Sequence, residues 1–145
     1  MASFTRTARA EWQGTGKEGK GNIGTQSGVL SATPYGFNTR FGDTKGTNPE
    51  ELLAAAEAAC FSMALAAGLE KAGHAPTRVE TQAACTVEKV GDGFQITSIR
   101  LRTRANVPGI DDAAFQQIAA ATKTGCPVSK ALAAVDIQLE ATLES

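Results

Sequence analysis

The segment that decides the fold is TNPEELLAAAEAACFSMALAAGLEKAG, Thr47 to Gly73. Asn48 is a favourable N-cap residue, Pro49 suits the first helical position, and Glu51 completes an N-x-x-E capping pattern. Gly73 is placed to end a helix in the left-handed conformation. The segment therefore predicts one long helix with a sequence signal at each end.

Alanine and leucine make this predicted helix apolar on nearly all of its sides, and Glu57 is the one charge between Glu51 and Glu70. A helix of this kind must be buried on nearly all sides, and small side chains let another helix approach closely. The chain has only one other substantial predicted helix. We therefore expect a homodimer in which two copies of the long helix pack together under sheet from both chains.

Length and charge exclude several classes of function. A chain of 145 residues is enough for one domain, which we expect to span residues 1–145. Lys and Arg number 14 against 15 Asp and Glu, without a basic face, so we expect no nucleic acid partner. The uncharged stretch of the long predicted helix, residues 58–69, is shorter than the roughly 20 residues of a membrane span, and the N-terminus lacks an apolar signal region. We expect no membrane partner and a cytoplasmic location.

The rest of the chain alternates hairpins with helices. Residues 4–12 and 22–30 flank the glycine-rich stretch GTGKEGKG and predict a hairpin, after which TPYG is a turn and FNTRF a short strand. Residues 78–90 and 94–107 form a second predicted hairpin around GDG. A helix over 111–125, a shorter one from Cys126 and a strand over 135–144 follow. This order predicts an α+β fold with antiparallel sheet.

Three cysteines and one histidine limit the covalent and metal chemistry. An odd number of cysteines does not make a disulfide framework, and one histidine without a close cysteine pair cannot complete a four-ligand zinc site. We therefore expect no metal site. If the thiols have a function, it is redox chemistry.

The three cysteines differ in their sequence surroundings. Cys85 falls on the apolar face of a predicted strand, which indicates packing. Cys126 precedes Pro127 at a predicted helix start, where free N–H groups favour the thiolate, although a cysteine replacing a serine cap fits this position equally well. Cys60 lies in mid-helix, where it is either a small apolar filler or a reactive thiol. To react it needs a cation from elsewhere, and Arg40 is a candidate unless it is an ordinary exposed strand arginine.

Several strings of the sequence carry a resemblance to a known family. SGVLSATPYGFNTRF, KGTNPEEL, AACFSMAL, VPGID and GCPVSKAL occur in this order over essentially the whole chain. In these strings the chain resembles the OsmC/Ohr family of thiol-dependent organic hydroperoxide reductases, and its OsmC branch more than its organic hydroperoxide resistance branch, because the arginine lies in NTRF. The resemblance implies an intertwined homodimer with antiparallel sheets wrapped around long central helices.

The resemblance also implies site residues and partners. Cys60 would be the peroxidatic thiol, Cys126 the resolving thiol, Arg40 the cation that holds the thiolate, and Glu50 the carboxylate that positions Arg40. The substrate would be an organic hydroperoxide, and the reductant a dithiol, with lipoylated proteins as its source. No cofactor is implied. Without the resemblance, Glu50 would be read as an ordinary acidic residue at a helix N-terminus.

Two further expectations concern assembly and the alternative functions. Glu50 and Cys60 are separated by about 15 Å along one helix axis, so we expect Glu50 of one chain to approach Cys60 of the other. The alternatives to an enzyme are a redox sensor that signals through a disulfide between Cys60 and Cys126, and a dimer that binds a small apolar ligand.

Overall fold

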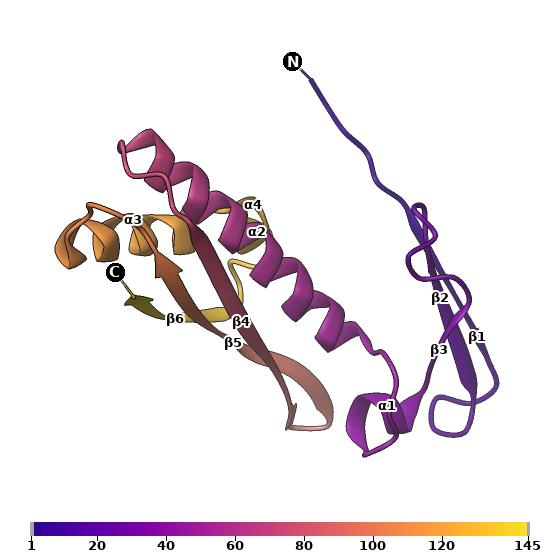
Figure 1. Ribbon diagram of the computed structural model, residues 1–145. Helices are drawn as coiled ribbons and strands as arrows, with labels where there is room; N and C mark the ends of the chain where they lie inside the picture. The colour runs from indigo at the N-terminus through magenta and orange to yellow at the C-terminus, as the bar shows by residue number, and fades with distance from the viewer. Residues whose placement is uncertain (1, 145) are drawn as a thin grey trace. The chain divides into compact units, whose positions relative to one another are not determined.

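The structure is a computed structural model that describes residues 2–144, and its contacts divide the chain into two compact units. The first unit extends to Pro49 and the second begins at Glu50. Figure 1 shows the elements of both units. The expectation of a single domain over residues 1–145 stays a prediction, because two contact units can belong to one domain.

The first unit is a small antiparallel sheet in the order β1 (Ala8–Gln13), β2 (Lys20–Thr25) and β3 (Thr33–Tyr35). The predicted first hairpin is confirmed by the pairing of β1 with β2. The rings of Trp12 and Tyr35 lie 5.4 Å apart, centroid to centroid, on either side of Gly21. A Cβ at Gly21 would come within 2.5 Å of the Tyr35 ring, so only glycine allows this aromatic pair.

The FNTRF segment differs from the prediction, because it is helix α1 (Phe37–Phe41) and not a strand. Thr39 explains the helix: its hydroxyl accepts a hydrogen bond from the Gly36 N–H and donates one to the Gly36 carbonyl, each at 2.9 Å. Phe37 and Phe41, four residues apart, pack with ring centroids at 5.1 Å and ring planes tilted by 58°. The predicted turn residue Pro34 lies instead in the edge strand β3, a position in which no ladder bond is lost.

The second unit is a three-stranded sheet with helices packed on it (Figure 1). Its strands are β4 (Arg78–Val90), β5 (Gly93–Asn106) and β6 (Asp136–Leu143), and its helices are α2 (Pro49–Lys71), α3 (Asp112–Gly125) and α4 (Pro127–Ala131). The second predicted hairpin is confirmed by the antiparallel pairing of β4 with β5. The structure differs from the expected purely antiparallel sheet at β6, which pairs parallel to β5. The helices between these two strands supply the crossover that parallel pairing requires.

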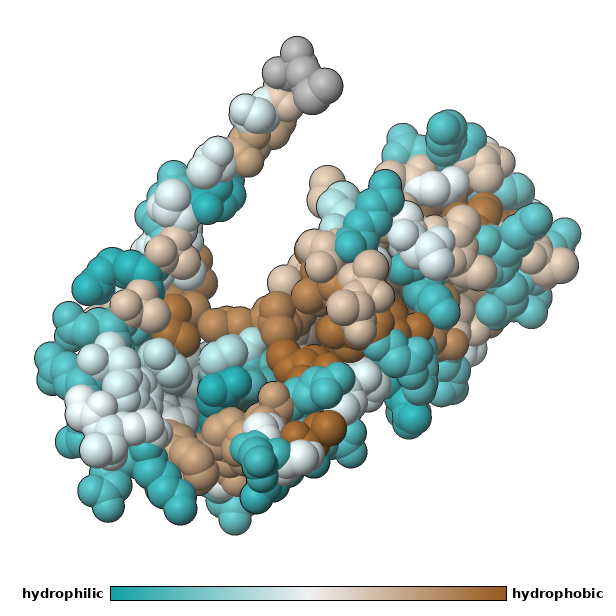
Figure 2. All heavy atoms as spheres, turned by 180° about the vertical axis from the view of Figure 1, so that it is seen from behind, coloured by the Kyte–Doolittle hydropathy of each residue, from teal (hydrophilic) through white to brown (hydrophobic). Residues whose placement is uncertain are grey.

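The core of the second unit lies between the helices and the sheet. The residues without exposed surface in this core are Phe61, Leu65, Leu69, Ile99, Leu101, Ala105, Val107, Phe115 and Ala119. The arginines of β5, Arg100, Arg102 and Arg104, alternate with buried residues and point away from the core. Hydrophobic atoms also reach the surface of this unit, as Figure 2 shows for one face, and Met63 on α2 is 79% exposed.

The long helix is confirmed over nearly its whole predicted length. α2 ends at Lys71, and Gly73 follows with φ at +90°, the left-handed conformation that a helix C-terminus favours. By length and composition alone α2 could cross a membrane. However, one face of α2 packs into the core of the second unit through Phe61, Leu65 and Leu69.

Candidate active site

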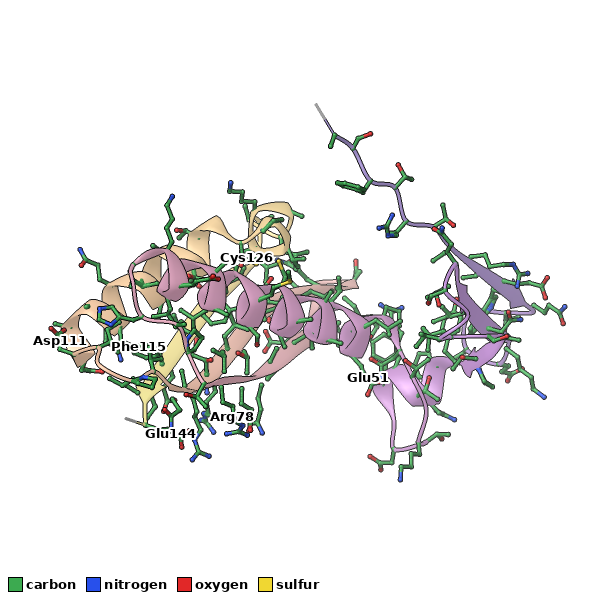
Figure 3. All side chains as sticks on the ribbon, turned by 45° about the horizontal axis from the view of Figure 1, so that its top comes forward. Glu51, Arg78, Asp111, Phe115, Cys126 and Glu144 are labelled. Atoms are coloured by element: carbon green, nitrogen blue, oxygen red, sulfur yellow. The ribbon has the colours of Figure 1, made fainter. Side chains whose placement is uncertain are left out.

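Two free cysteines from distant parts of the sequence meet in the second unit. The Sγ atoms of Cys60 and Cys126 lie 3.1 Å apart, although 66 residues separate them. Cys60 lies in the middle of α2 and is half-buried, whereas Cys126 joins α3 to α4 and is 1% exposed. Figure 3 shows Cys126 beside α2. A disulfide requires the sulfur atoms to approach by only about another 1 Å.

Cys126 is held at the start of α4 by the local sequence. It is the N-cap residue, Pro127 takes the first helical position, and the Ser129 N–H points at the Cys126 Sγ atom over 3.5 Å. Burial by itself raises the pKa of Cys126, but hydrogen bonds from the Ser129 hydroxyl, from Cys60 and from backbone amides outweigh burial and lower it. Both sequence interpretations of Cys126 are thus compatible with the structure: it caps the helix, and its thiolate is favoured.

Cys60 has the opposite electrostatic environment. Burial raises its pKa, and the hydrogen bond with Cys126 raises it further. The negative charge of Glu57, one helical turn away, acts in the same direction, whereas a backbone amide at Val128 lowers the pKa. The net direction is upward, so a reactive thiolate at Cys60 requires a positive charge near it.

Glu57 and Ser129 form a buried polar contact next to the two thiols. Glu57 has no exposed surface, Ser129 is 4% exposed, and the Ser129 Oγ lies 2.5 Å from the Glu57 Oε1. The same Oγ atom lies 3.5 Å from the Cys126 Sγ. A continuous hydrogen-bonded chain therefore runs from the carboxyl group of Glu57 to the thiol of Cys126.

The other two predicted site residues lie in different units. Glu50 is in the first turn of α2 and is 6% exposed, on the same continuous helix as Cys60. Arg40 belongs to α1 in the first unit, where its guanidinium carbon lies 4.9 Å from the centroid of the Phe41 ring. Arg40 and aromatic residues, among them Trp12 and Tyr35, line a cavity of about 250 Å³ in that unit.

Cys85 is separate from the thiol pair. It lies on β4 and packs against the core of the second unit, as its strand pattern predicts. Burial raises the pKa of Cys85, and the negative charge of Glu50 raises it further. A thiol with these neighbours is not activated for nucleophilic attack.

The sequence interpretation missed Glu57 and Ser129. Glu57 was visible as the one charge in an apolar run, three residues before Cys60, and Ser129 as the third residue after Cys126. Neither position indicates contact by itself, because α2 and α4 are far apart in the sequence. Only their packing brings the carboxyl and hydroxyl groups together.

The fold and the thiol pair define a redox protein of the α+β class, and comparison with known proteins gives its family. A family model described as OsmC-like protein matches residues 42–140, so the chain belongs to the OsmC-like family. The chain is 51% identical over 140 residues to peroxiredoxin OsmC of Escherichia coli, with 97% of each chain covered. It is 32% identical to the organic hydroperoxide resistance protein OhrB of Bacillus subtilis, over 83% of this chain and 88% of OhrB.

Solved structures have the same fold. The crystal structure of OhrB from Bacillus subtilis superimposes with a TM-score of 0.69 at 30% identity, over 94% of this chain and 98% of that chain. An OsmC protein from Legionella pneumophila superimposes with a TM-score of 0.73 at 24% identity, over 98% and 99% of the two chains. The predicted α+β class and the predicted family resemblance are both confirmed.

Proposed function

We propose that this protein reduces organic hydroperoxides to alcohols, with Cys60 as the peroxidatic thiol and Cys126 as the resolving thiol. It is a peroxidase by its 51% identity to a peroxiredoxin over 97% of the chain. The observation that supports these two residue roles is the 3.1 Å separation of their Sγ atoms. A thiol that is oxidised here has its resolving partner already in contact.

The proposed reaction has two oxidative steps. The Cys60 thiolate attacks the distal oxygen of the hydroperoxide, the O–O bond breaks, and the alkoxide leaves as the alcohol. The Cys60 sulfur is then a sulfenic acid. Cys126 attacks that sulfur, the S–O bond breaks, and a disulfide and water form. No metal or organic cofactor takes part.

Activation of Cys60 is the role proposed for Arg40 and Glu50. Because the surroundings of Cys60 in its own unit raise its pKa, a cation is needed to hold the thiolate at neutral pH. A guanidinium can also stabilise negative charge that develops on the peroxide oxygens, and a carboxylate can hold its planar donors in place. These roles are carried over from the family resemblance to residues that this chain retains.

We propose that the active protein is a homodimer formed along α2. The face of α2 that stays exposed in one chain is an apolar stripe of Ala55, Ala59, Met63 and Ala67, spaced four residues apart. Glu57 points the other way and is buried within its own unit. Packing of two such stripes across a two-fold axis would bury them and would bring Glu50 of one chain toward Cys60 of the other.

The proposed electron donor is a dithiol. A disulfide between Cys60 and Cys126 is reduced by thiolate attack, and a second thiol on the same donor completes the exchange without a mixed-disulfide trap. Lipoyl groups on proteins are dithiols of this kind. The protein is proposed to act in the cytoplasm.

The test is a peroxidase assay with cumene hydroperoxide and dihydrolipoamide as the dithiol. We expect multiple turnovers from the native chain, no reduction by C60S, and a single oxidation per chain without dithiol-driven turnover by C126S. Mass spectrometry after one equivalent of hydroperoxide identifies the sulfenic acid or disulfide in each variant.

The outcomes separate the enzyme from the alternatives. A single stoichiometric oxidation of the native chain, without turnover in the presence of dithiol, would identify a redox sensor. Turnover by C60S would show that the peroxidatic thiol is misassigned. Unchanged thiols after exposure to hydroperoxide would support a dimer that binds an apolar ligand.

A further inference from the structure

The two oxidative steps leave one buried ionisable group beside the thiols unexplained. Glu57 is 0% exposed, its Oε1 contacts the Ser129 hydroxyl, and its Oε2 has no hydrogen-bond partner among residues 2–144. A charged carboxylate is costly in such a position, and a residue that serves packing alone would be apolar. A carboxyl group at this position is explained if it takes part in the reaction.

Ser129 connects this carboxyl group to the resolving thiol. Its Oγ lies 2.5 Å from the Glu57 Oε1 and 3.5 Å from the Cys126 Sγ, but a hydroxyl has one hydrogen to donate. If Ser129 donates to an ionised Glu57, its oxygen accepts the S–H of Cys126. If Glu57 carries the proton and donates to Ser129, the hydroxyl donates to a Cys126 thiolate. The two states contain the same atoms and the same single negative charge.

We propose that Glu57, Ser129 and Cys126 form a proton relay that generates the resolving thiolate. This inference rests on the proposed function, in which Cys126 attacks oxidised Cys60. Ser129 touches the reacting sulfur, and Glu57 acts through Ser129. In the relay, the Cys126 proton passes to the Ser129 Oγ while the Ser129 hydrogen passes to the Glu57 Oε1.

Atoms, electrons and protons balance when the relay works through one catalytic cycle. When the S–S bond forms, the Cys126 sulfur is oxidised, the Cys60 sulfenic sulfur is reduced, and the S–O bond breaks. The oxygen leaves as hydroxide and takes a proton from solvent to become water, while Glu57 keeps the proton that came from Cys126. When the dithiol reduces the disulfide and is itself oxidised, Cys126 leaves as a thiolate and Glu57 returns its proton through Ser129.

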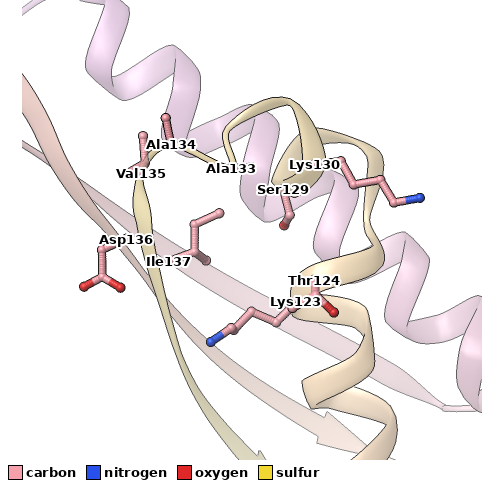
Figure 4. Close-up of a pocket in the computed structure, with 9 residues that line it drawn as sticks. All are labelled: Lys123, Thr124, Ser129, Lys130, Ala133, Ala134, Val135, Asp136 and Ile137. Carbon is pink, nitrogen blue, oxygen red and sulfur yellow. The ribbon is translucent and has the colours of Figure 1, made fainter.

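The surroundings of the relay restrict exchange of its proton with bulk water. Cys60 and Glu57 face it from α2, and Cys126 and Ser129 face it from the start of α4. Ser129 also lines one wall of an adjoining groove (Figure 4). The charged residues that line this groove are Lys123 on α3, Lys130 on α4 and Asp136 on β6. The relay residues themselves are nearly or fully buried, so exchange of the proton with bulk water is restricted.

The experiment measures the two oxidative steps separately in the full chain. One equivalent of cumene hydroperoxide is mixed with reduced native protein, E57Q, S129A or the conservative E57D, and samples are quenched and analysed for sulfenic acid and disulfide by mass spectrometry. We expect disulfide formation at pH 7 to slow by about a hundredfold in E57Q and in S129A, the range for loss of general base catalysis. E57D keeps a carboxyl group and should recover part of the rate.

The pH profile separates a relay from a structural role. Without the relay, Cys126 must lose its proton to water, so in E57Q the rate of disulfide formation should rise about tenfold per pH unit below the pKa of Cys126. The native rate should depend much less on pH in that range. Two control variants alter comparable groups away from the relay: S62A removes a partly buried hydroxyl that donates to Thr81, and E70Q changes an exposed glutamate of α2.

Each outcome decides the relay or the function. Native rates of disulfide formation in E57Q and S129A, or slow rates that do not vary with pH, would overturn the relay while the proposed function stands. Failure of the native protein to form sulfenic acid or disulfide would overturn the proposed function itself. If E57Q does not fold, as judged by circular dichroism, S129A alone decides, because it removes only one buried hydroxyl.

Discussion

Cys126 and Cys60 differ in burial and in the direction in which their surroundings shift the pKa. The thiol proposed to resolve is the more buried one, and hydrogen bonds lower its pKa, whereas the thiol proposed to meet the peroxide is half-buried with a raised pKa. This inequality suits the proposed order of events. Only the first thiol needs access to substrate, and Arg40 is the proposed source of its activating charge.

Cys85 provides a test of how the three cysteines are assigned. We expect C85A to keep nearly native peroxidase turnover and to lose about 1 kcal/mol of unfolding free energy, because its side chain packs against the core without taking part in chemistry. Urea denaturation and the steady-state assay measure the two effects. Loss of most turnover in a folded C85A protein would show that Cys85 belongs to the redox site.

At the scale of elements, α3 begins with a side-chain cap at Asp111. The Asp111 Oδ1 accepts a hydrogen bond from the Ala114 N–H at 2.8 Å, and α3 leads directly into Cys126. We expect D111A to destabilise the chain by about 1 kcal/mol, and D111N, which keeps the acceptor, to lose much less. Urea midpoints of the two variants give the comparison, and equal losses would contradict a capping role.

Elements were predicted well where the signals are local. The ends of α2 follow from Pro49 and Gly73, and the alternation along β5 follows from its arginines. FNTRF was wrongly predicted as a strand because two phenylalanines and a threonine favour strands, whereas the hydrogen bonds between Thr39 and Gly36 form only in the helical conformation. The parallel pairing of β6 depends on a crossover, which no local pattern specifies.

At the scale of the whole molecule, the site could also be predicted only where its residues lie in local sequence motifs. Cys60 and Cys126 were predicted as the thiol pair because both lie in long strings that resemble the family, and the structure places their Sγ atoms 3.1 Å apart. The contact of Glu57 with Ser129 spans 72 residues and depends on packing of α2 against α4. Long-range contacts of this kind are set by the tertiary fold and not by spacing along the chain.

The proposed two-chain site makes a quantitative prediction. E50A and C60S are each expected to be inactive, but a heterodimer of the two would contain one site with both residues intact. Random exchange of equal amounts gives half heterodimers, so about a quarter of the native activity should return. Native mass spectrometry verifies the exchange, and steady-state turnover measures the recovery. No recovery after verified exchange would place Glu50 and Cys60 of each site in one chain.

The contact between the two sulfur atoms has a consequence for the unfolded chain. A covalent bond between Cys60 and Cys126 would close a loop over the 66 positions that separate them, enclosing the β4–β5 hairpin and α3. Loop closure of that length removes enough chain entropy from the unfolded state to favour the folded one by about 4 kcal/mol. Each catalytic cycle would therefore alternate between a cross-linked form that resists unfolding and an open form that unfolds more easily. The thermal stability of a sample would then report the fraction of the protein that is in the cross-linked form and has not yet been reduced.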